Sequence, residues 1–446
     1  MCGIAGLLAP PGDPDARTRA ATAMAATLAH RGPDDEGAWS DPSGTVAFGF
    51  RRLAIIDLTA EGHQPMASAD GRYRVVFNGE FYGFEALRTE LLAQGVAFRG
   101  HSDTEVMLAA VSAWGLERTI PRLWGMFAFA LWDAVDQRLH LVRDRVGKKP
   151  LYYGWFGDTF LFGSELKALR AHPSFTGRID REALASYLRF SYVPSPRSIY
   201  QGVHKLAPAS WLSIDPTRPG DPGTAVRYWD ARVVAADGLA HPLRLTDAQA
   251  IERAEELLSD AVRLRAVADV PVGAFLSGGI DSSVVVALLQ ATSTRRVATF
   301  TIGYDDDEYD ESGHAAAIAR HLGTEHTELR VSPEQTLDVI PRLPELYDEP
   351  FADASQLPTT VVSMLARRHV TVALSGDGGD EVFGGYNRYV TGTRLWARLA
   401  RLPTPLRRGS SRLIESVPPR GWDKVGSMAD RLLPATRKGV LTGNNI

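Results

Sequence analysis

The stretch VGAFLSGGIDSS, residues 272–283, decides the fold of the second half of this 446-residue chain. An apolar strand runs into a pair of glycines, and a helical pattern follows at once. Such a loop presents successive backbone N–H groups at a helix N-terminus, which suits a phosphate group. Further buried strands, VATFTIG at 297–303 and VTVALSG at 370–376, alternate with helical segments. We therefore predict an α/β, doubly wound parallel sheet.

A second glycine loop, ALSGDGGDEVFGGY at 373–386, follows the last of these strands. In an open parallel sheet both loops fall at the carboxyl edge, where ligands bind. Acidic side chains beside a phosphate site indicate Mg²⁺, which prefers carboxylate and phosphate oxygens. Either loop alone is equally well explained as a tight turn that needs glycine. Together they favour a nucleoside triphosphate site, although neither matches G-x-x-x-x-G-K-[ST] or G-x-G-x-x-G.

The first half has a different pattern. Short strands are expected at 45–50, 73–80, 127–133 and 138–144, with a turn near Asp136, and helices at 84–95 and 102–115. Ser102 and Glu105 have the spacing of a capping box. Strands and helices without strict alternation predict an α+β arrangement. Because 194–245 is rich in Pro, Gly and Ser, we expect a first domain over 2–205, a linker over 206–245 and a second domain over 246–446.

Composition limits the function classes. The chain is 44% hydrophobic and 23% charged, typical of globular domains, and its formal net charge of −4 argues against nucleic acid as a partner. A single cysteine excludes an intramolecular disulfide and favours a cytoplasmic location, and no apolar run has the length of a membrane span. The basic segment 394–424 could contact a membrane surface or nucleic acid, but its prolines favour short packing helices.

Several motifs in order make the sequence resemble the glutamine-hydrolysing asparagine synthetase family from residue 2 to about 390. They are MCGIAG (1–6), HRGPDDEG (30–37), RRLAIIDLTAEGHQPM (51–66), FNGEFY (77–82), HSDTE (101–105), SGGIDSS (277–283) and SGDGGDEVFGGY (375–386). The resemblance implies an αββα N-terminal-nucleophile hydrolase domain, a class II glutamine amidotransferase, followed by a synthetase domain of the ATP-pyrophosphatase type. It implies an asparagine synthase, a carbon–nitrogen ligase that takes nitrogen from glutamine and uses ATP and Mg²⁺.

The resemblance also explains why the only cysteine is Cys2. Family members lose the initiator Met1, so that the cysteine carries the free α-amino group. That amine titrates near 8 and can act as the general base for its own thiol. The alternative is an incidental cysteine near the terminus.

By the same resemblance Asn78 and Gly79 form the oxyanion hole, Arg52 holds the α-carboxylate of glutamine, and Glu80 and Asp103 hold its α-ammonium. Leu53 and Ile56 shape the slot. A turn at Asn78 and Gly79, and a favourable helix start at Asp103, are the structural alternatives. His30 and Arg31 belong near this site, with a structural role as the alternative.

In the second domain the resemblance implies that Asp281 and Asp380 hold Mg²⁺ and that Asp377 assists catalysis. The residues implied for ATP are Phe275, Ser277, Gly278, Gly279, Asp281, Ser282, Ser283, Ile302, Ser375 and Gly376. The acceptor carboxylate would form an acyl-adenylate, and ammonia from the first domain would displace AMP. Because the family passes ammonia through an internal tunnel, we expect the two sites to face each other.

Two departures from the family pattern bear on the reaction. The resemblance makes aspartate the first expected acceptor. Many asparagine synthetases have Glu where this chain has Asp377, and this difference makes a sugar acid or another carboxylate the alternative. The family continues with a helical region that supplies a lysine, which Lys424 and Lys438 do not match. We therefore expect the C-terminal part to be incomplete, with a glutaminase beside an inactive synthetase domain as the rival interpretation. Association into a homodimer is left open.

Overall fold

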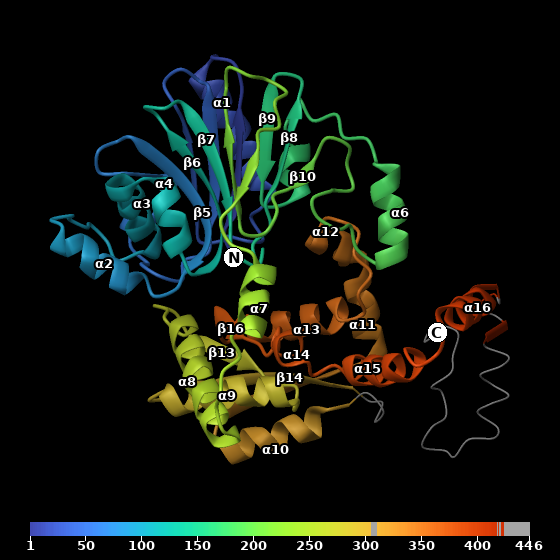
Figure 1. Cartoon of the computed structure of the whole chain (residues 1–446). Coiled ribbons are helices and arrows are strands. Elements are labelled where there is room, and N and C mark those ends of the chain that lie inside the picture. Colours follow the sequence, from blue (N-terminus) through green and yellow to red (C-terminus); the bar gives the residue numbers. More distant parts are fainter. Residues whose placement is uncertain (305–309, 417, 419–420, 423–446) are drawn as a thin grey trace. The chain divides into compact units, whose positions relative to one another are not determined.

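The computed structural model of the protein describes residues 1–304, 310–416, 418, 421 and 422. The chain separates into two compact units, Met1–Gly376 and Asp377–Ile446. The first unit contains three β-sheets and the helices that cover them (Figure 1).

Two six-stranded antiparallel sheets form the N-terminal part of the first unit. One sheet has the order β10-β8-β9-β1-β3-β2, and the other has the order β12-β11-β7-β6-β5-β4. The strands of the first are β1 (Gly3–Leu8), β2 (Asp35–Ser40), β3 (Val46–Arg52), β8 (Tyr152–Phe156), β9 (Thr159–Gly163) and β10 (His204–Lys205). Those of the second are β4 (Met66–Ala67), β5 (Tyr73–Phe81), β6 (Gly125–Asp133), β7 (Arg138–Arg143), β11 (Ser210–Ile214) and β12 (Ala225–Arg227).

The alternation of side chains along each strand stacks these sheets face to face. On β5, Val76 packs with Ile4 and Phe48 of the first sheet, whereas Val75 and Phe77 point to the opposite face. Helices cover both outer faces, which gives the four layers αββα that the sequence predicts; α2 and α3 lie beside β5 in Figure 1. The helices are α1 (Pro14–Ala26), α2 (Phe84–Ala93), α3 (Asp103–Trp114), α4 (Leu116–Thr119), α5 (Leu166–Arg170) and α6 (Arg181–Phe190).

The third sheet is parallel, with the order β15-β14-β13-β16. Its apolar strands are covered on both faces, by α8, α9 and α10 on one and by α11 and α13 on the other. The doubly wound α/β prediction is confirmed. The strands are β13 (Val272–Phe275), β14 (Ala298–Tyr304), β15 (Glu325–Val331) and β16 (Val372–Leu374). The helices are α8 (Asp247–Arg265), α9 (Ile280–Thr292), α10 (Ser312–Leu322), α11 (Pro333–Val339), α12 (Leu343–Tyr347) and α13 (Gln356–Ala366).

The segment 206–245, expected to be a linker, is partly folded into the first domain. Its first part forms β11 and β12, and β11 pairs with β7 in the second antiparallel sheet, where Leu212 lies opposite Leu141. The prolines and glycines between these strands lie in turns of the first domain. Within this segment, only residues 231–245, which include helix α7 (Ala231–Ala240) and are exposed, have the features of a linker.

Helix α3 begins as its sequence predicts, with one difference. The Ser102 side chain accepts a hydrogen bond from the Glu105 backbone N–H at 3.2 Å. The Glu105 carboxylate does not complete the capping box, because it accepts the backbone N–H groups of Arg99 and Gly100, both at 2.9 Å. It thereby holds the loop before the helix that carries Asp103.

The second unit contains α14 (Gly379–Phe383), α15 (Asn387–Leu399) and α16 (Thr404–Ser416). Pro403 and Pro405 lie at the break between α15 and α16, as expected for residues that cannot continue a helix. Lys424 and Lys438 lie outside the described residues. Within the part of the chain that the structure describes, no helix is both long enough and apolar enough to cross a membrane.

Candidate active site

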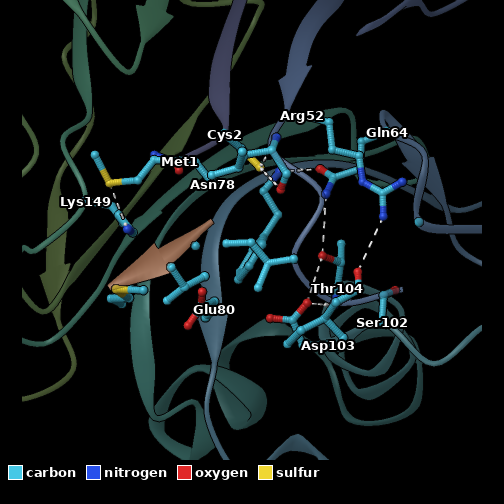
Figure 2. Close-up of a pocket in the computed structure, with 18 of the residues that line it drawn as sticks. Met1, Cys2, Arg52, Gln64, Asn78, Glu80, Ser102, Asp103, Thr104 and Lys149 are labelled. Carbon is cyan, nitrogen blue, oxygen red and sulfur yellow. Dashed lines mark hydrogen bonds between the residues drawn. The ribbon is translucent and has the colours of Figure 1, made fainter. Parts of the chain in front are cut away.

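A cavity of about 320 Å³ lies where β1, β3 and β5 come closest to the start of α3. It brings together residues from distant parts of the chain, among them Cys2 and Asp103, which are 101 positions apart in the sequence (Figure 2). Every residue predicted for the glutamine site lines it: Cys2, Arg52, Leu53, Ile56, Asn78, Gly79, Glu80 and Asp103. The antiparallel pairing of β1 with β3 places Cys2 next to the Arg52 end of β3.

The Cys2 side chain is held by main-chain groups. The Leu53 backbone N–H donates to Cys2 Sγ at 3.4 Å, and the thiol lies 3.7 Å from the Leu53 carbonyl oxygen. Arg31 Nε donates to the Cys2 carbonyl at 2.9 Å. Burial raises the pKa of the Cys2 thiol, and the N-terminal amine, the Leu53 N–H, Lys149 and Arg52 oppose that rise. Ionisation of the thiol therefore depends on the positive groups around it.

Asn78 is fully buried on β5, yet neither its side-chain nitrogen nor its side-chain oxygen has a hydrogen-bond partner among the described residues. Leaving a buried amide unpaired costs about 1–3 kcal/mol, so such a group indicates a ligand or a catalytic role. Gly79 follows it, and a Cβ there would collide with the Met126 carbonyl and with Phe127 on β6. The close pairing of β5 with β6 thus requires glycine beside the unpaired amide.

Two buried carboxyl groups, Glu80 and Asp103, line the cavity. Burial raises the pKa of Glu80 to about 7, although Lys149 opposes the rise. Burial likewise raises the pKa of Asp103 to about 6. Asp103 is oriented by the backbone N–H groups of Phe81, at 2.8 Å, and Thr104, at 2.7 Å. A cationic group entering the cavity would relieve the cost of these buried negative charges.

The Arg52 guanidinium is braced by the loop that follows β3. It donates to the carbonyl oxygens of Thr59 at 3.2 Å and Ile56 at 3.4 Å, and to that of Asp57. These contacts fix its position in the cavity wall. Its predicted ion pair with the α-carboxylate of glutamine remains a prediction.

His30 and Arg31 lie behind the nucleophile. Both pair with Glu165, Arg31 Nη1 at 2.7 Å and His30 Nε2 at 3.1 Å. Burial would raise the pKa of Glu165, but the hydrogen bond from His30 and the charge of Arg31 lower it to about 2. Arg31 also donates to the Cys2 carbonyl, which fits the structural alternative for this residue, whereas His30 contacts Glu165; a structural role for both remains a prediction.

Sequence reasoning missed several residues of the cavity. Lys149 lies on the loop after β7, and Gln64 Oε1 accepts the Phe77 backbone N–H at 2.6 Å from within the motif RRLAIIDLTAEGHQPM. Thr371, Val372 and Ala373 reach the same cavity from the parallel sheet. Nothing in the surrounding sequence RDRVGKKP distinguishes the buried Lys149 from the exposed Lys148, so the sequence carried no signal for this residue.

The first glycine loop lies between β13 and α9, as predicted. Ser277 and Ser282 hydroxyl oxygens are 3.0 Å apart, and the Ser277 hydroxyl accepts the Gly279 backbone N–H at 3.3 Å. The Ser283 hydroxyl donates to the Gly279 carbonyl at 2.6 Å. Gly278 has a φ of +85°, which other residues rarely adopt. The serines thus fold the loop on itself at the N-terminus of α9.

The second glycine loop approaches the first. A Cβ on Gly376 would lie 2.6 Å from the Ser282 backbone nitrogen and 2.9 Å from the Asp281 carbonyl carbon. β13 and β16 are neighbours in the parallel sheet, so both loops leave the same edge. The expectation that both glycine loops leave the same edge of the sheet is confirmed, whereas ATP binding by Ser375 and Gly376 remains a prediction. The narrow space allows only a backbone without a side chain at Gly376.

Other residues predicted for the nucleotide site have mixed surroundings. Phe275 packs against the core cluster of Phe300 and Leu365, and Ile302 packs on the cluster that contains Val331, so contact with a base remains a prediction for both. Asp281 lies in the first turn of α9. Asp377 and Asp380 belong to the second unit. Among the described residues no group of three or more His, Cys, Asp or Glu side chains could hold a metal ion.

One carboxylate beside phosphate-binding backbone still fits Mg²⁺, which is usually held by one or two carboxylates together with substrate phosphates. Asp281, in the first turn of α9 directly after the glycine loop, is the predicted ligand among the described residues of the first unit. The metal sites therefore stay predictions.

Comparisons with known proteins match a family model to each half of the chain. Residues 1–229 match a glutamine amidotransferase domain model, and residues 253–438 match an asparagine synthase model. The chain is 38% identical over 394 residues to asparagine synthetase [glutamine-hydrolyzing] 1 of Bacillus subtilis, covering 87% of this chain and 59% of that protein. It is 35% identical to asparagine synthetase [glutamine-hydrolyzing] 3 of the same organism, covering 81% and 59%.

A third relative has another name. Amidase chry2 of Gibberella zeae is 32% identical, with 81% of this chain and 54% of that protein covered. The chain thus spans less than two thirds of the length of each of these three relatives.

Proposed function

The chain belongs to the glutamine-hydrolysing asparagine synthetase family, and on that premise we propose that its first domain hydrolyses glutamine and its second domain uses ATP to amidate a carboxylate. One observation carries the first part: the unpaired, buried Asn78 amide lies in the same cavity as the Cys2 thiol. A nucleophile beside an amide donor without a partner is the arrangement that acyl transfer needs.

Removal of Met1 would place the α-amino group on Cys2. Burial lowers the pKa of the amine at this end of the chain, here on Met1, to about 5, so its surroundings favour the neutral form that can accept a proton. The amine would take the thiol proton, and the thiolate would attack the amide carbon of glutamine. Collapse of the tetrahedral intermediate breaks the carbon–nitrogen bond, releases ammonia with the transferred proton and leaves a thioester. Water then releases glutamate.

Asn78→Ala tests the oxyanion hole. We expect kcat for glutamate release to fall by about 100-fold to 1000-fold, because one donor contributes about 3 kcal/mol in the transition state. The KM for glutamine should change little, since the amide contacts the substrate oxygen most strongly when it is charged. Steady-state glutamate release checks this. A loss of affinity with kcat unchanged would assign Asn78 to ground-state binding instead.

The pH dependence of glutamine binding provides a separate test. Glu80 and Asp103, with pKa values near 7 and 6, attract the α-ammonium only when ionised, and both lose their charge as pH falls. We expect the KM for glutamine to rise about tenfold between pH 8 and pH 6, from the protonation of Glu80 alone. Glu80→Gln should raise KM at pH 8 and flatten the profile. A KM independent of pH in the unmodified protein would exclude this role.

For the second domain, the adjacent glycine loops support ATP binding. Phosphate would be contacted by backbone N–H groups of residues 277–279 and by the Ser282 and Ser283 hydroxyls, which would have to exchange the hydrogen bonds they now make within the loop, and Asp281 would hold Mg²⁺. Bound Mg²⁺ would neutralise charge on the phosphates during pyrophosphate release. The acceptor carboxylate oxygen attacks the α-phosphorus, the bond to pyrophosphate breaks, and ammonia then displaces AMP from the acyl-adenylate.

The strand β16 supports a direct route for ammonia. Thr371, which precedes the strand, and its first two residues, Val372 and Ala373, line the cavity of Cys2, and the strand leads to Ser375 and Gly376 beside the nucleotide loop. Three residues of strand span roughly 10 Å. Ammonia, which is mostly protonated in bulk water at neutral pH, would need a sheltered path of this kind.

Aspartate is the acceptor that we propose first, because of the relatives named as asparagine synthetases. A different carboxylate is the second candidate, favoured by Asp377 in place of Glu and by the relative named as an amidase. Pyrophosphate release with ATP, Mg²⁺ and glutamine, measured with aspartate and with a panel of other carboxylates, decides between them. Glutamate release with no pyrophosphate for any carboxylate would leave a glutaminase with an inactive second domain.

A further inference from the structure

Lys149 occupies an unusual position for a lysine. Its side chain is 4% exposed and lines the cavity of Cys2 and Glu80. Figure 2 shows its ammonium directed at Met1, where Nζ lies 3.0 Å from the Met1 sulfur. Within the described ranges it forms no ion pair within 4 Å with any carboxylate. A buried ammonium without a carboxylate partner is costly, so its position calls for a function.

The loop that carries Lys149 is rigidly organised by Asp144, a fully buried side chain. Asp144 Oδ1 accepts the backbone N–H groups of Val146 at 3.1 Å and Lys148 at 2.9 Å. Asp144 Oδ2 accepts those of Phe127 at 3.2 Å and Lys149 at 3.0 Å. These bonds fix the backbone at Lys149, from which the side chain enters the cavity.

The one hydrogen bond that Lys149 Nζ makes among the described residues involves Met1, the residue that the proposed maturation removes. After that removal the ammonium faces the new N-terminus at Cys2. We propose that Lys149 activates the nucleophile, because its positive charge favours both the thiolate of Cys2 and the unprotonated form of the adjacent amine. This inference deepens the proposed glutamine hydrolysis and rests on it.

The surroundings of Lys149 agree with that role. Burial lowers the pKa of the Lys149 ammonium to about 8, with Glu80 and Cys2 opposing the change and Arg31 adding to it. The lysine thus keeps its charge near neutral pH. The other charged groups facing the thiol are Arg52, the N-terminal amine and, across the cavity, Glu80 and Asp103. Arg31 and Arg52 donate to the Cys2, Ile56 and Thr59 carbonyl oxygens, whereas among the described residues the Lys149 ammonium donates to no carbonyl or carboxylate oxygen.

The single cysteine makes a direct test possible, because Cys2 carries the only thiol of the chain that iodoacetamide can alkylate. The rate of alkylation, followed by mass spectrometry from pH 6 to pH 10, reports the fraction of thiolate. For Lys149→Met we expect alkylation about tenfold slower near pH 7, where the ammonium is charged, since a nearby opposite charge shifts a pKa by about 1–3 units. The two profiles should converge at high pH, because Lys149 itself loses its charge around pH 8. Lys149→Arg, which keeps the charge, should restore most of the rate.

Lys148→Met is the matched control, because Lys148 is the exposed neighbour on the same loop. Its alkylation profile should coincide with that of the unmodified protein. Circular dichroism verifies folding of each variant, and Lys149→Gln replaces Lys149→Met if the latter does not fold. Superimposable profiles for a folded neutral variant at Lys149 and the unmodified protein would overturn the inference.

Glutamate release by the same variants separates this inference from the proposed function. An unmodified protein that hydrolyses glutamine, with alkylation insensitive to Lys149, would leave the function standing and remove Lys149 from it. A shifted alkylation profile in a protein that releases no glutamate would leave the effect of Lys149 on the thiol and refute the glutaminase. When the protein releases glutamate and Lys149 also affects the thiol, the acid limb of kcat/KM for glutamine should move in Lys149→Met by the same amount as the alkylation profile.

Discussion

Replacing Cys2 by Ala is expected to abolish glutamate release and glutamine-dependent pyrophosphate release, while ammonium salts still support amidation. The chain has one cysteine, so no other thiol can take over the attack on glutamine. Cys2 packs at the edge of the core between the two antiparallel sheets, and loss of its sulfur should cost little stability. The ammonia-dependent reaction needs only the second domain, which the substitution leaves unchanged.

The measurement compares pyrophosphate release with glutamine and with ammonium chloride, each with ATP, Mg²⁺ and the acceptor. Equal loss of both reactions in a folded Cys2→Ala protein would refute the division of labour between the domains. Retained glutamate release would show that Cys2 is not the nucleophile. Mass spectrometry of the unmodified protein should find Met1 removed, because only then is the Cys2 amine free.

Gly376→Ala is expected to have the second large effect, on the ATP half of the reaction alone. The added methyl group would lie 2.6 Å from the Ser282 nitrogen, and backbone on both sides leaves no flexible side chain to move away. One of the two glycine loops must shift, and a displacement of about 1 Å in a reacting group can cost about 100-fold in rate. We therefore expect pyrophosphate release to fall by about two orders of magnitude.

Glutamate release should persist in Gly376→Ala, since Gly376 does not line the cavity of Cys2. Gly313→Ala is the matched control, because a Cβ at Gly313 on α10 meets no atom within 4 Å. That variant should turn over ATP like the unmodified protein. Wild-type pyrophosphate release in Gly376→Ala would mean that the two loops do not approach each other in the working enzyme.

Much of the fold was predictable because its signals are local. Along β5 and β6, alternate side chains pack either between the two sheets or against the helices. Helix α3 begins after Ser102 and ends before Gly115, as its sequence predicts. The linker was misjudged for the same reason. Prolines and glycines mark turns wherever they occur, and only the pairing of β11 with β7 shows that these turns belong to the first sheet pair.

The sequence by itself determined the nucleophile candidate, the two glycine loops and the eight residues predicted to surround glutamine, because each belongs to a motif whose members are close along the chain. The tertiary structure alone decided which charges face the thiol. Lys149 reaches Cys2 from 147 positions away, through a loop that Asp144 folds, and Thr371–Ala373 enters the same cavity from another sheet. Packing between distant segments sets the electrostatics of a buried thiol, and no local pattern in the sequence encodes that packing.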